Sequence, residues 1–555
     1  MSERSSQASE LPRIVAWLVL AVALFFSVER LGAGVDLEDE ATHIAIPYRF
    51  VLGDRPFVDE INPIQTAAFI TQPLIWAYVQ VTRGTEGIVL FTRIAYLLAC
   101  IGAAFIAVKH AREFVGVGLA ALCAAPIVVQ MPGIPNLGYH TLASLGFTAG
   151  AFAVAHGLQR EQARGWIFAG GILHALAAVA IQVYFFAGLV FAVAAVVWLS
   201  PGRSKRALLP YAVGALVTGL ALAPQFLDLG SETISYAYRH TMRDGTWWFK
   251  VQWVFANQIR MIPHKLEFGI ALAALLAAAR LRWKWPGVVA CLALPVIAWQ
   301  ERGAVGANIY TTVLAMTAPF LFLALRDKQS ARKLFFGLWL PSFVSGLGLA
   351  WASSVHVLSE GYAQLPACIV TSILAIMLLR ELAPERGAWT AALWTVIVIG
   401  GFILHQRRPY NDDALHALDT RITSGPWKGI ATTRAKAEYL YSVQADVERF
   451  TAPDRRVMFF THFPAGYLMS AMRPAASSVW AITCPGEPSW DGCADRLEHD
   501  LDRYGAAGVV VFDMKSTFHT QNNIPPLQRG PAHRVLEKCL ERVHSTPAYD
   551  VYMGH

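Results

Sequence analysis

Apolar residues form long runs, separated by short polar segments, over the first three quarters of the chain. These runs predict thirteen membrane-spanning helices, at about 13–29, 88–107, 115–131, 140–157, 165–182, 184–199, 207–229, 266–280, 286–299, 309–325, 333–351, 365–380 and 388–404. A helix perpendicular to the membrane needs about 20 residues to cross the hydrocarbon core. The run 165–199 is therefore too long for one span, and we divide it into a tight hairpin at Gln182.

Composition supports a protein that crosses the membrane many times. The chain has 555 residues, of which 55% are hydrophobic and 15% charged, and its mean hydropathy is +0.41. A soluble domain carries about 25% charged residues. The net charge of +7 does not indicate a nucleic-acid partner, because an excess of Lys and Arg marks the cytoplasmic loops of membrane proteins.

The same bias predicts the orientation of the chain. With a cytoplasmic N-terminus, the inside segments contain most of the cations: Arg4, Arg13, Lys109, Arg112, Arg160, Arg164, Arg203, Lys205, Arg206, Arg280, Arg282, Lys284, Arg326, Lys328, Arg332, Lys333, Arg380 and Arg386. The short outside loops contain only Arg302. We therefore expect a multi-pass protein of the cytoplasmic (inner) membrane, with residues 405–555 outside the cytoplasm.

Three outside segments are large enough to carry function. The first loop, residues 31–87, contains two segments with the pattern of interfacial helices, at 41–52 and 64–82. The second loop, residues 230–265, interleaves cations with aromatic residues. The tail, residues 405–555, predicts a small α/β domain after a membrane domain at 1–404.

Short runs rich in β-branched and aromatic residues predict the strands of the tail, and periodic runs predict its helices. The strands are expected within 455–462, 477–483, 508–513 and 549–553, and the helices within 433–450 and 494–504. Thr432 or Thr433 is expected to cap the first of these helices.

The stretch "GVDLEDEATHIAIPYRF", residues 34–50, follows the first predicted span directly. It contains the acidic cluster, which we define as Asp36, Glu38, Asp39 and Glu40. One interpretation is structural: Asp36 caps the interfacial helix, and acidic loops are common on the outer face. The other is chemical, because a carboxylate at the membrane surface can act as a general base for a hydroxyl acceptor.

The second loop suggests a partner for such a base. Its Arg239 and Arg243 lie among Tyr and Trp residues, a pattern suited to a lipid with an anionic head, whose phosphate would bind the cations. An ordinary amphipathic helix at the membrane surface would show the same pattern, and both interpretations stay open.

The run "DEATHIAIPYRFVLGDRPFVDEINPIQTAAF" resembles the first external loop of the glycosyltransferase C superfamily, which uses polyprenyl-phosphate-linked sugars. It is similar to the branches of protein O-mannosyltransferases, lipid A aminoarabinose transferases and arabinofuranosyltransferases. The resemblance places the family's acidic pair at Asp39 and Glu40, with Asp39 as the base; Glu38 and Asp39 are an alternative register. Glu40 and Asp59 would orient the acceptor or tune the base, and Asp59 and Glu60 are expected to help bind the substrate.

Two further motifs resemble the family more loosely. In "GYHTLASL", His140 stands where the family often has Asp, so neither a second acidic catalytic residue nor a metal site is expected there, and His140 is expected to contact the substrate. In "GANIYTTVLAMTAP", preceded by Arg302, the residues Asn308 and Tyr310 are expected to contact the sugar.

These features predict a membrane glycosyltransferase that moves a sugar from a polyprenyl phosphate to an extracytoplasmic glycan, lipid or protein, and the resemblance implies that the transfer inverts the sugar. Arg239, Arg243 and Arg302 would bind the lipid phosphate. The sequence identifies no cofactor and no metal ligands, and a divalent cation is compatible with the site. The rival hypotheses are a transporter or flippase of a lipid-linked sugar, and a receptor-like module that binds glycan without catalysis.

Overall fold

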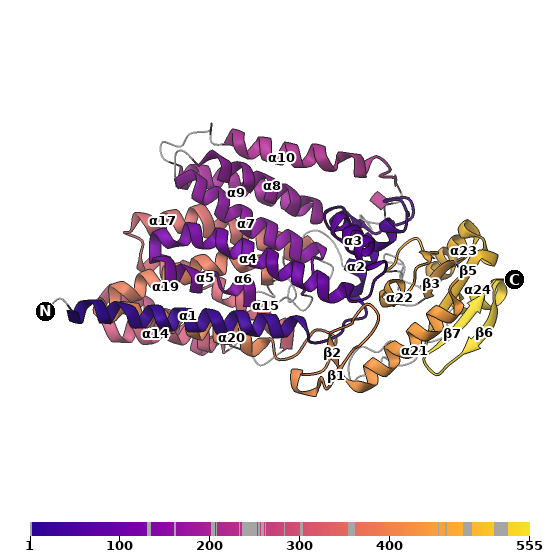
Figure 1. The fold of residues 1–555 in the computed structure, drawn as a ribbon. Helices are drawn as coiled ribbons and strands as arrows, with labels where there is room; N and C mark the ends of the chain where they lie inside the picture. Colours follow the sequence, from indigo (N-terminus) through magenta and orange to yellow (C-terminus); the bar gives the residue numbers. More distant parts are fainter. Residues whose placement is uncertain are drawn as a thin grey trace.

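The computed structural model of the protein describes the chain except residues 1–2, 130–134, 160–162, 201–205, 207, 232, 236–251, 253–255, 257–259, 261, 263, 282, 300–302, 353–360, 453, 461–462, 481–490, 516–530 and 555. A bundle of helices forms the larger part, and a smaller domain with a β-sheet lies at one end of it (Figure 1). The N-terminus lies at the opposite end of the bundle.

The bundle contains α1 (Glu3–Leu31), α4 (Ile88–Val115), α5 (Val117–Ala124), α6 (Pro126–Val129), α7 (Tyr139–Gln159), α8 (Arg164–Ala180), α9 (Val183–Leu199), α10 (Leu208–Leu222), α13 (Lys265–Leu281), α14 (Lys284–Ile297), α15 (Gly303–Ala315), α16 (Ala318–Ala324), α17 (Gln329–Leu334), η5 (Phe335–Trp339), α18 (Leu340–Ala352), α19 (Leu365–Leu382) and α20 (Gly387–His405). Each predicted span coincides with one of these helices or with consecutive ones. The expected hairpin is confirmed, because α8 ends at Ala180 and α9 begins at Val183.

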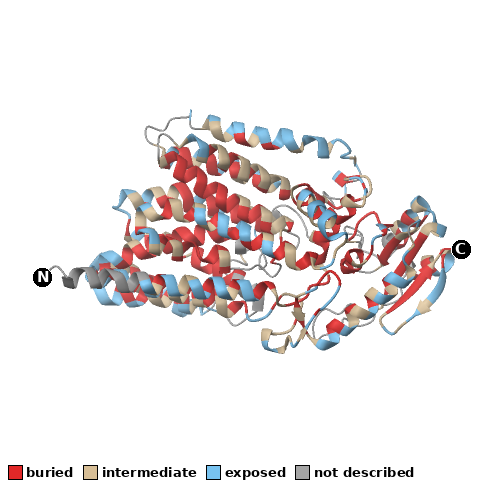
Figure 2. Ribbon diagram, in the orientation of Figure 1, coloured by how far each residue is buried: buried red, intermediate tan, exposed pale blue. Residues whose placement is uncertain are grey.

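Seven helical segments of the described chain are long and apolar enough to cross a membrane, and five shorter apolar helices accompany them. The protein is therefore a multi-pass membrane protein, while the number of thirteen spans stays a prediction. Helices α1 and α10 expose large apolar side chains such as Trp17, Phe25 and Leu216, whereas α7 and α19 are mostly buried (Figure 2). Exposed apolar faces of this kind are suited to lipid.

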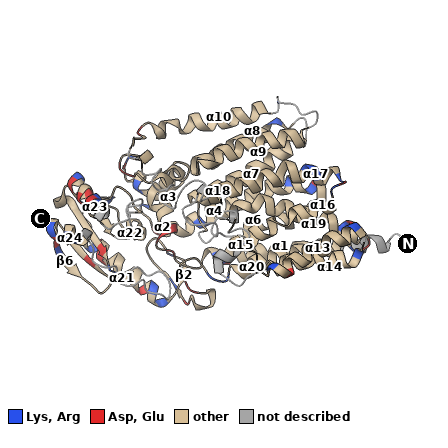
Figure 3. Cartoon of the chain, turned by 180° about the vertical axis from the view of Figure 1, so that it is seen from behind, with Lys and Arg blue, Asp and Glu red and all other residues tan. Residues whose placement is uncertain are grey.

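Charged residues avoid the middle of the bundle (Figure 3). Lys and Arg gather at the end that carries α17, and both signs of charge are dense on the C-terminal domain. Lys328 and Arg332, two of the cations that the sequence analysis placed inside the cell, lie at α17, at the end away from that domain.

The first loop forms α2 (Asp39–Val51), the 3₁₀ turn η1 (Pro63–Ala67) and α3 (Ala68–Thr82). The two expected helices are therefore confirmed, and they lie at the end of the bundle next to the C-terminal domain (Figure 1). The Gln182 side chain, in the turn between α8 and α9, donates a hydrogen bond to Thr66 Oγ1 at 3.1 Å. This contact places the α8–α9 turn at the same end of the bundle.

The C-terminal domain has a five-stranded mixed sheet of order β4-β3-β5-β7-β6. Strands β3 (Arg456–Phe460), β4 (Arg473–Pro474) and β5 (Val509–Met514) are parallel, and β6 (Glu541–Ser545) and β7 (Tyr549–Met553) pair in antiparallel fashion. Helices α21 (Arg434–Phe450), α22 (Pro464–Met469), α23 (Asp491–Tyr504) and α24 (Pro531–Cys539) complete it. A small two-stranded sheet, β1 (Thr420–Arg421) and β2 (Ala431–Thr432), precedes α21.

Most of the predicted elements of the tail are confirmed. Thr433 caps α21, because its side chain accepts a hydrogen bond from the backbone N–H of Lys436. The strand expected within 477–483 is absent from 477–480; 481–483 lie outside the described residues. The backbone of Ser477 and Val479 instead bonds to the first loop: Ile61 N–H donates to Ser477 O, and Val479 N–H donates to Glu60.

The first loop and the C-terminal domain share one hydrophobic core. It contains Ile44, Tyr48 and Phe69 from the first loop together with Phe459 and Phe512 from the sheet. Residues 31–87 and 405–555 therefore belong to the same side of the molecule.

Candidate functional site

The acidic cluster lies where the first loop enters α2. The Asp36 carboxylate accepts hydrogen bonds from the backbone N–H of Glu38, at 3.0 Å, and of Glu40, at 2.8 Å. These N–H groups belong to the first turn, where a helix leaves its donors unpaired. The structural interpretation of Asp36 as a cap is thus confirmed for this one residue.

Glu40 is fully buried and forms an ion pair with Arg93 of α4. Arg93 donates from Nε to Glu40 Oε1 at 2.7 Å and from Nη2 to Oε2 at 2.6 Å. Its remaining N–H groups donate to the carbonyl oxygens of Leu31, Ala33 and Gly34. A bidentate pair of this kind fixes direction as well as charge. Glu40 therefore joins α2 to α4 and to the end of α1.

Asp39 is half-buried and forms neither an ion pair nor a metal cluster with the described residues. The hydroxyl of Tyr410, which follows α20, donates to Asp39 Oδ2 at 2.8 Å. Burial raises the pKa of Asp39 to about 7; the negative charges of Asp36 and Glu38 act in the same direction, and the Tyr410 hydrogen bond opposes them. A carboxyl group with this pKa can accept and release a proton near neutral pH.

A group of neutral polar side chains lies one helical turn further along α2. His43 Nδ1 lies 3.3 Å from Asn136 Oδ1, and Asn136 Nδ2 donates to the carbonyl oxygen of Glu40 at 3.1 Å. Residues four apart share a helix face, so His43 lies on the same face as Asp39. Burial, and to a smaller extent His140, lowers the pKa of His43 to about 3, which keeps this imidazole neutral at physiological pH.

His140, predicted to contact substrate, lies at the start of α7 beside this group. The Tyr139 ring contacts His43 edge-on, with centroids 5.2 Å apart, and also lies against His140. Gly138 approaches the His43 ring so closely that a Cβ atom there would overlap it. The structure thus brings Asp39, His43 and His140 into one polar region at the end of the bundle.

Tyr410 and Asn411 belong to this region, and the sequence analysis missed both. Asn411 Nδ2 donates to Asp36 Oδ1 at 3.1 Å, while Tyr410 bonds to Asp39. The only signal in the sequence is the polar run "RRPYND" after the last apolar run, which is typical of a turn. Nothing in that run indicates that it returns to residues almost 400 positions earlier.

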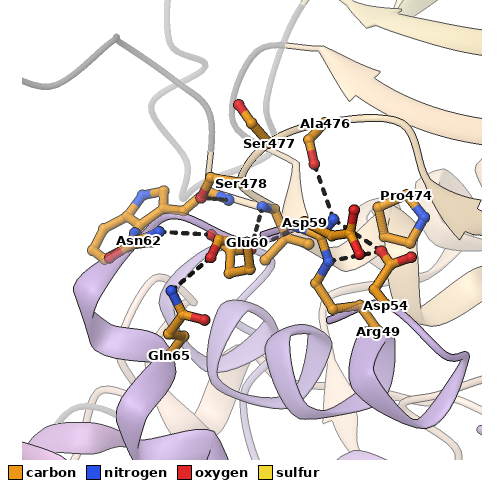
Figure 4. Close-up of polar contacts among 12 residues, drawn as sticks. Arg49, Asp54, Asp59, Glu60, Asn62, Gln65, Pro474, Ala476, Ser477 and Ser478 are labelled. Carbon is orange, nitrogen blue, oxygen red and sulfur yellow. Dashed lines mark hydrogen bonds and ion pairs between the residues drawn. The ribbon is translucent and has the colours of Figure 1, made fainter. Parts of the chain in front are cut away.

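Asp59 and Glu60 lie in a second network, which joins the first loop to the C-terminal domain (Figure 4). Glu60 is buried and accepts from Arg49 Nη1 at 2.8 Å and from the backbone N–H of Asn62 and Val479, each at 3.0 Å. Asp59 accepts from Arg55 N–H at 2.7 Å and from Arg503 Nη2 at 3.0 Å.

Arg49 is the centre of this second network. It is fully buried, it also pairs with Asp54 at 2.9 Å, and it donates to the Ala476 carbonyl oxygen. No contact joins Asp59 or Glu60 to Asp39 within the described part of the chain. The observed partners give Asp59 and Glu60 a role in domain attachment, and their contact with substrate stays a prediction.

The remaining predicted residues lie deeper or outside the described part of the chain. Asn308 and Tyr310 are buried on α15, where the Tyr310 ring stacks on His405, at 5.3 Å between centroids, near the end of α20. Arg239, Arg243 and Arg302 lie outside the described residues. The described residues contain no group of three or more His, Cys, Asp and Glu side chains that could hold a metal ion.

Comparison with known proteins finds similarity of structure only. No protein-family model matches the sequence, and no curated protein matches it. Among solved structures, ArnT from Cupriavidus metallidurans in the apo state has a TM-score of 0.49 and 12% identity, with 96% of this chain and 97% of that chain covered. The same protein bound to undecaprenyl phosphate has a TM-score of 0.44 and 13% identity, with 97% of each chain covered.

An oligosaccharyltransferase from an archaeon is also similar. AglB from Archaeoglobus fulgidus, in complex with an inhibitory peptide and a dolichol-phosphate, has a TM-score of 0.44 and 14% identity, covering 90% of this chain and 69% of that chain. These alignments cover 90% or more of this chain, at 12–14% identity. At these TM-scores and identities, the roles of single residues follow from this chain's own contacts.

Proposed function

We propose that the protein is an inverting membrane glycosyltransferase that moves a sugar from a polyprenyl-phosphate donor to a hydroxyl acceptor outside the cytoplasm. Asp39 is the general base. The acceptor is a glycan, lipid or protein that reaches the end of the bundle where α2 meets the C-terminal domain.

The observation that carries this proposal is the different environment of neighbouring carboxylates. Asp36 bonds to the first turn of α2, and Glu40 is neutralised by Arg93. Asp39 has only a neutral hydroxyl donor among the described residues, and its pKa is raised to about 7. A perturbed carboxyl group at the membrane surface is a candidate for acid–base work.

The proposed step balances in atoms and charge. The Asp39 carboxylate takes the proton of the acceptor hydroxyl while the acceptor oxygen forms a bond to the anomeric carbon. The bond between that carbon and the phosphate oxygen breaks, and the polyprenyl phosphate leaves with the electron pair. General-base help in such a step contributes about 10²–10⁴ in rate.

Cations are needed for the phosphate that leaves. Arg239, Arg243 and Arg302 keep this proposed role, since Arg239 and Arg243 lie among aromatic residues in the second outside loop and Arg302 lies in a short outside loop. Arg93 does not meet the need, because all of its N–H donors engage Glu40 or backbone carbonyl groups.

The contacts between the first loop and the tail support the proposed orientation. Both segments share one core, so the chain must cross the membrane an even number of times between residues 87 and 405. Twelve of the predicted spans lie in that interval. The N-terminus would then be on the opposite side, and the bias of Lys and Arg makes that side the cytoplasm.

Envelope glycans compared by mass spectrometry, with and without the protein, test this function. We expect cells without the protein to lack one sugar at one linkage, and cells with Asp39→Asn to lack the same sugar. Asp419→Asn is the matched control, because Asp419 is exposed and, among the described residues, its carboxylate accepts a hydrogen bond only from Thr420. Normal glycans in cells with Asp39→Asn would contradict the proposal and would favour a transporter or a binding module.

A further inference from the structure

The segment that follows α20 folds back onto the acidic cluster. We define residues 409–412 as the return segment. Its contacts with Asp36 and Asp39 come from Asn411 and Tyr410, at 3.1 and 2.8 Å. The C-terminal domain therefore begins with residues that bond directly to the proposed base and to its neighbour.

The return segment is fixed on both sides by buried charges. Asp412 Oδ2 accepts from the backbone N–H of Val35 at 2.6 Å and from Thr432 Oγ1 at 2.7 Å. Lys436 of α21 donates to the carbonyl oxygens of Val35, at 2.8 Å, and Asn411, at 2.6 Å. Lys436 and Asp412 are both buried and lie 3.5 Å apart. These bonds connect α21, the return segment and the residue that precedes Asp36.

The backbone that precedes the acidic cluster is held as well. Gly34 N–H donates to the Ala431 carbonyl oxygen at 2.8 Å, and Ala431 N–H donates to Gly32 at 2.7 Å. Gly34 has φ +85°, and a Cβ atom there would overlap the Pro409 side chain. Asn411 has φ +51°, a left-handed conformation that Asn tolerates better than most residues. The backbone conformation around the return segment therefore depends on a glycine at position 34 and an asparagine at position 411.

We propose that the return segment is a clamp through which the C-terminal domain positions the base, with Tyr410 as the positioning residue that holds Asp39 Oδ2 and leaves Oδ1 for the acceptor hydroxyl. Asp39 Oδ1 has no hydrogen-bond partner among the described residues, in agreement with this division. The role of Asp39 as a base rests on the function proposed above. The positioning of its carboxylate by the clamp rests only on the contacts of the return segment.

The clamp has a consequence for the protonation of Asp39. A hydroxyl that donates to a carboxylate favours the ionised form, so the Tyr410 bond lowers the pKa of Asp39 against the effect of burial. Without that bond the base would be protonated at a higher pH. The tyrosine therefore keeps more of the base ionised near neutral pH.

Other charged groups near Asp39 must be considered with Tyr410. Its own segment contributes Asp36, Glu38 and, one turn on, His43. The elements packed around it contribute Arg93 of α4, which is paired with Glu40, His140 of α7, Asp412 of the return segment and Lys436 of α21. The sequences of α3 and α22, which also pack on α2, contain no Asp, Glu, Lys, Arg or His.

A measurement without substrate can test the clamp. Thermal unfolding of the full-length protein in detergent is followed between pH 4 and 9, and each protein is compared with the same protein carrying Asp39→Asn. Because burial raises the pKa of Asp39 in the folded protein above its unfolded value, the folded protein holds an extra proton between these two values, and the difference in Tm changes with pH only there. On the high-pH side, the slope of this difference falls to half its maximum at the folded-state pKa of Asp39, and we call that pH the midpoint. The comparison is made for the natural chain and for Tyr410→Phe.

We expect Tyr410→Phe to move this midpoint to higher pH by about one unit, since a hydrogen bond to a charged group is worth about that much. Tyr441→Phe is the matched control and should leave the midpoint in place, because the Tyr441 hydroxyl bonds only to Thr423 within the described part of the chain. Gly34→Ala, which displaces Pro409, should move the midpoint in the same direction as Tyr410→Phe.

An unchanged midpoint in Tyr410→Phe, or a shift to lower pH, would overturn the clamp. This result can be separated from failure of the proposed function. If Asp39→Asn abolishes sugar transfer but Tyr410→Phe leaves the midpoint unchanged, only the clamp is wrong. If the midpoint moves as expected but Asp39→Asn still transfers sugar, the clamp stands and Asp39 is not the base.

Discussion

At the scale of single residues, two adjacent carboxylates differ because of their partners. Glu40 faces a guanidinium and is fully buried, whereas Asp39, one position earlier, faces a hydroxyl and is half-buried. Consecutive residues of a helix point in directions about 100° apart, so one turns toward α4 and the other toward the return segment. The alternative register, with Glu38 and Asp39 as the pair, keeps Asp39 in its role.

Asp36→Asn tests the electrostatic coupling within the acidic cluster. The negative charge of Asp36 raises the pKa of Asp39, so a neutral Asn should lower that pKa. The rate of sugar transfer falls at low pH because the base becomes protonated. We therefore expect the acid limb of the pH–rate profile to move to lower pH.

Asp36→Asn also removes one acceptor from the first turn of α2, which should cost about 1–3 kcal/mol of stability. The position of the acid limb does not depend on how much protein is folded, so the two effects can be separated. A limb that moves to higher pH, or that matches the Asp419→Asn control, would contradict the coupling.

At the scale of elements, α2 is held at its first turn by one ion pair. The Arg93 guanidinium connects α4 to Glu40 and to three carbonyl oxygens at the end of α1. Removing one partner of a buried pair leaves an uncompensated charge, which costs about 3–5 kcal/mol.

We expect Glu40→Gln to lower the free energy of unfolding by about that amount, and to reduce transfer less than Asp39→Asn does per folded molecule. Thermal unfolding in detergent measures the first effect. Glu86→Gln is the matched control, because Glu86 pairs with Lys428 at the surface, where ion pairs contribute little. Equal stability of the two variants would show that Glu40 does not anchor α2.

The cations of the second loop can be tested separately as ligands of the lipid phosphate. Arg239→Ala and Arg243→Ala should weaken binding of the polyprenyl-phosphate donor by roughly tenfold or more, because a hydrogen bond to a charged group contributes about 1.5–3 kcal/mol. Acceptor binding should change less. Donor affinity measured for both variants decides the point: if neither changes, the basic and aromatic pattern belongs to the membrane surface and not to the site.

At the scale of the whole molecule, the C-terminal domain and the first loop form one unit at the end of the helical bundle (Figure 1). We expect a reporter fused to the C-terminus, and a thiol label placed in the first loop, to be accessible from the same side of the membrane. The N-terminus should be accessible only from the other side. A C-terminus on the side of the N-terminus would show that the number of spans is even.

The sequence predicted the parts of this molecule that local pattern determines. The apolar runs located the helices of the bundle, the interfacial pattern located α2 and α3, and Thr433 marked the start of α21. Four acidic residues directly after a span also indicated a candidate base in this turn of the chain, and that assignment stays a prediction.

The parts that the sequence did not predict are contacts across long separations. Tyr410 and Asp39 are 371 positions apart, and Val479 and Glu60 are 419 apart. The run 477–480 has strand-forming residues, yet its backbone bonds to the first loop, because tertiary contacts override a short local preference. The bonds of Asp59 to Arg503 and of Glu60 to Val479 were missed for the same reason, because these partners lie in the C-terminal domain.

The most direct test of the central claim is a single-turnover measurement of sugar transfer by Asp39→Asn, with the polyprenyl-phosphate donor that the glycan comparison identifies. The substitution keeps the size of the side chain and a hydrogen-bond acceptor for Tyr410. We expect the transfer rate to fall by about 10²–10⁴ while donor affinity and folding stay close to those of the natural chain. A rate within a fewfold of normal would contradict the assignment of Asp39 as the base.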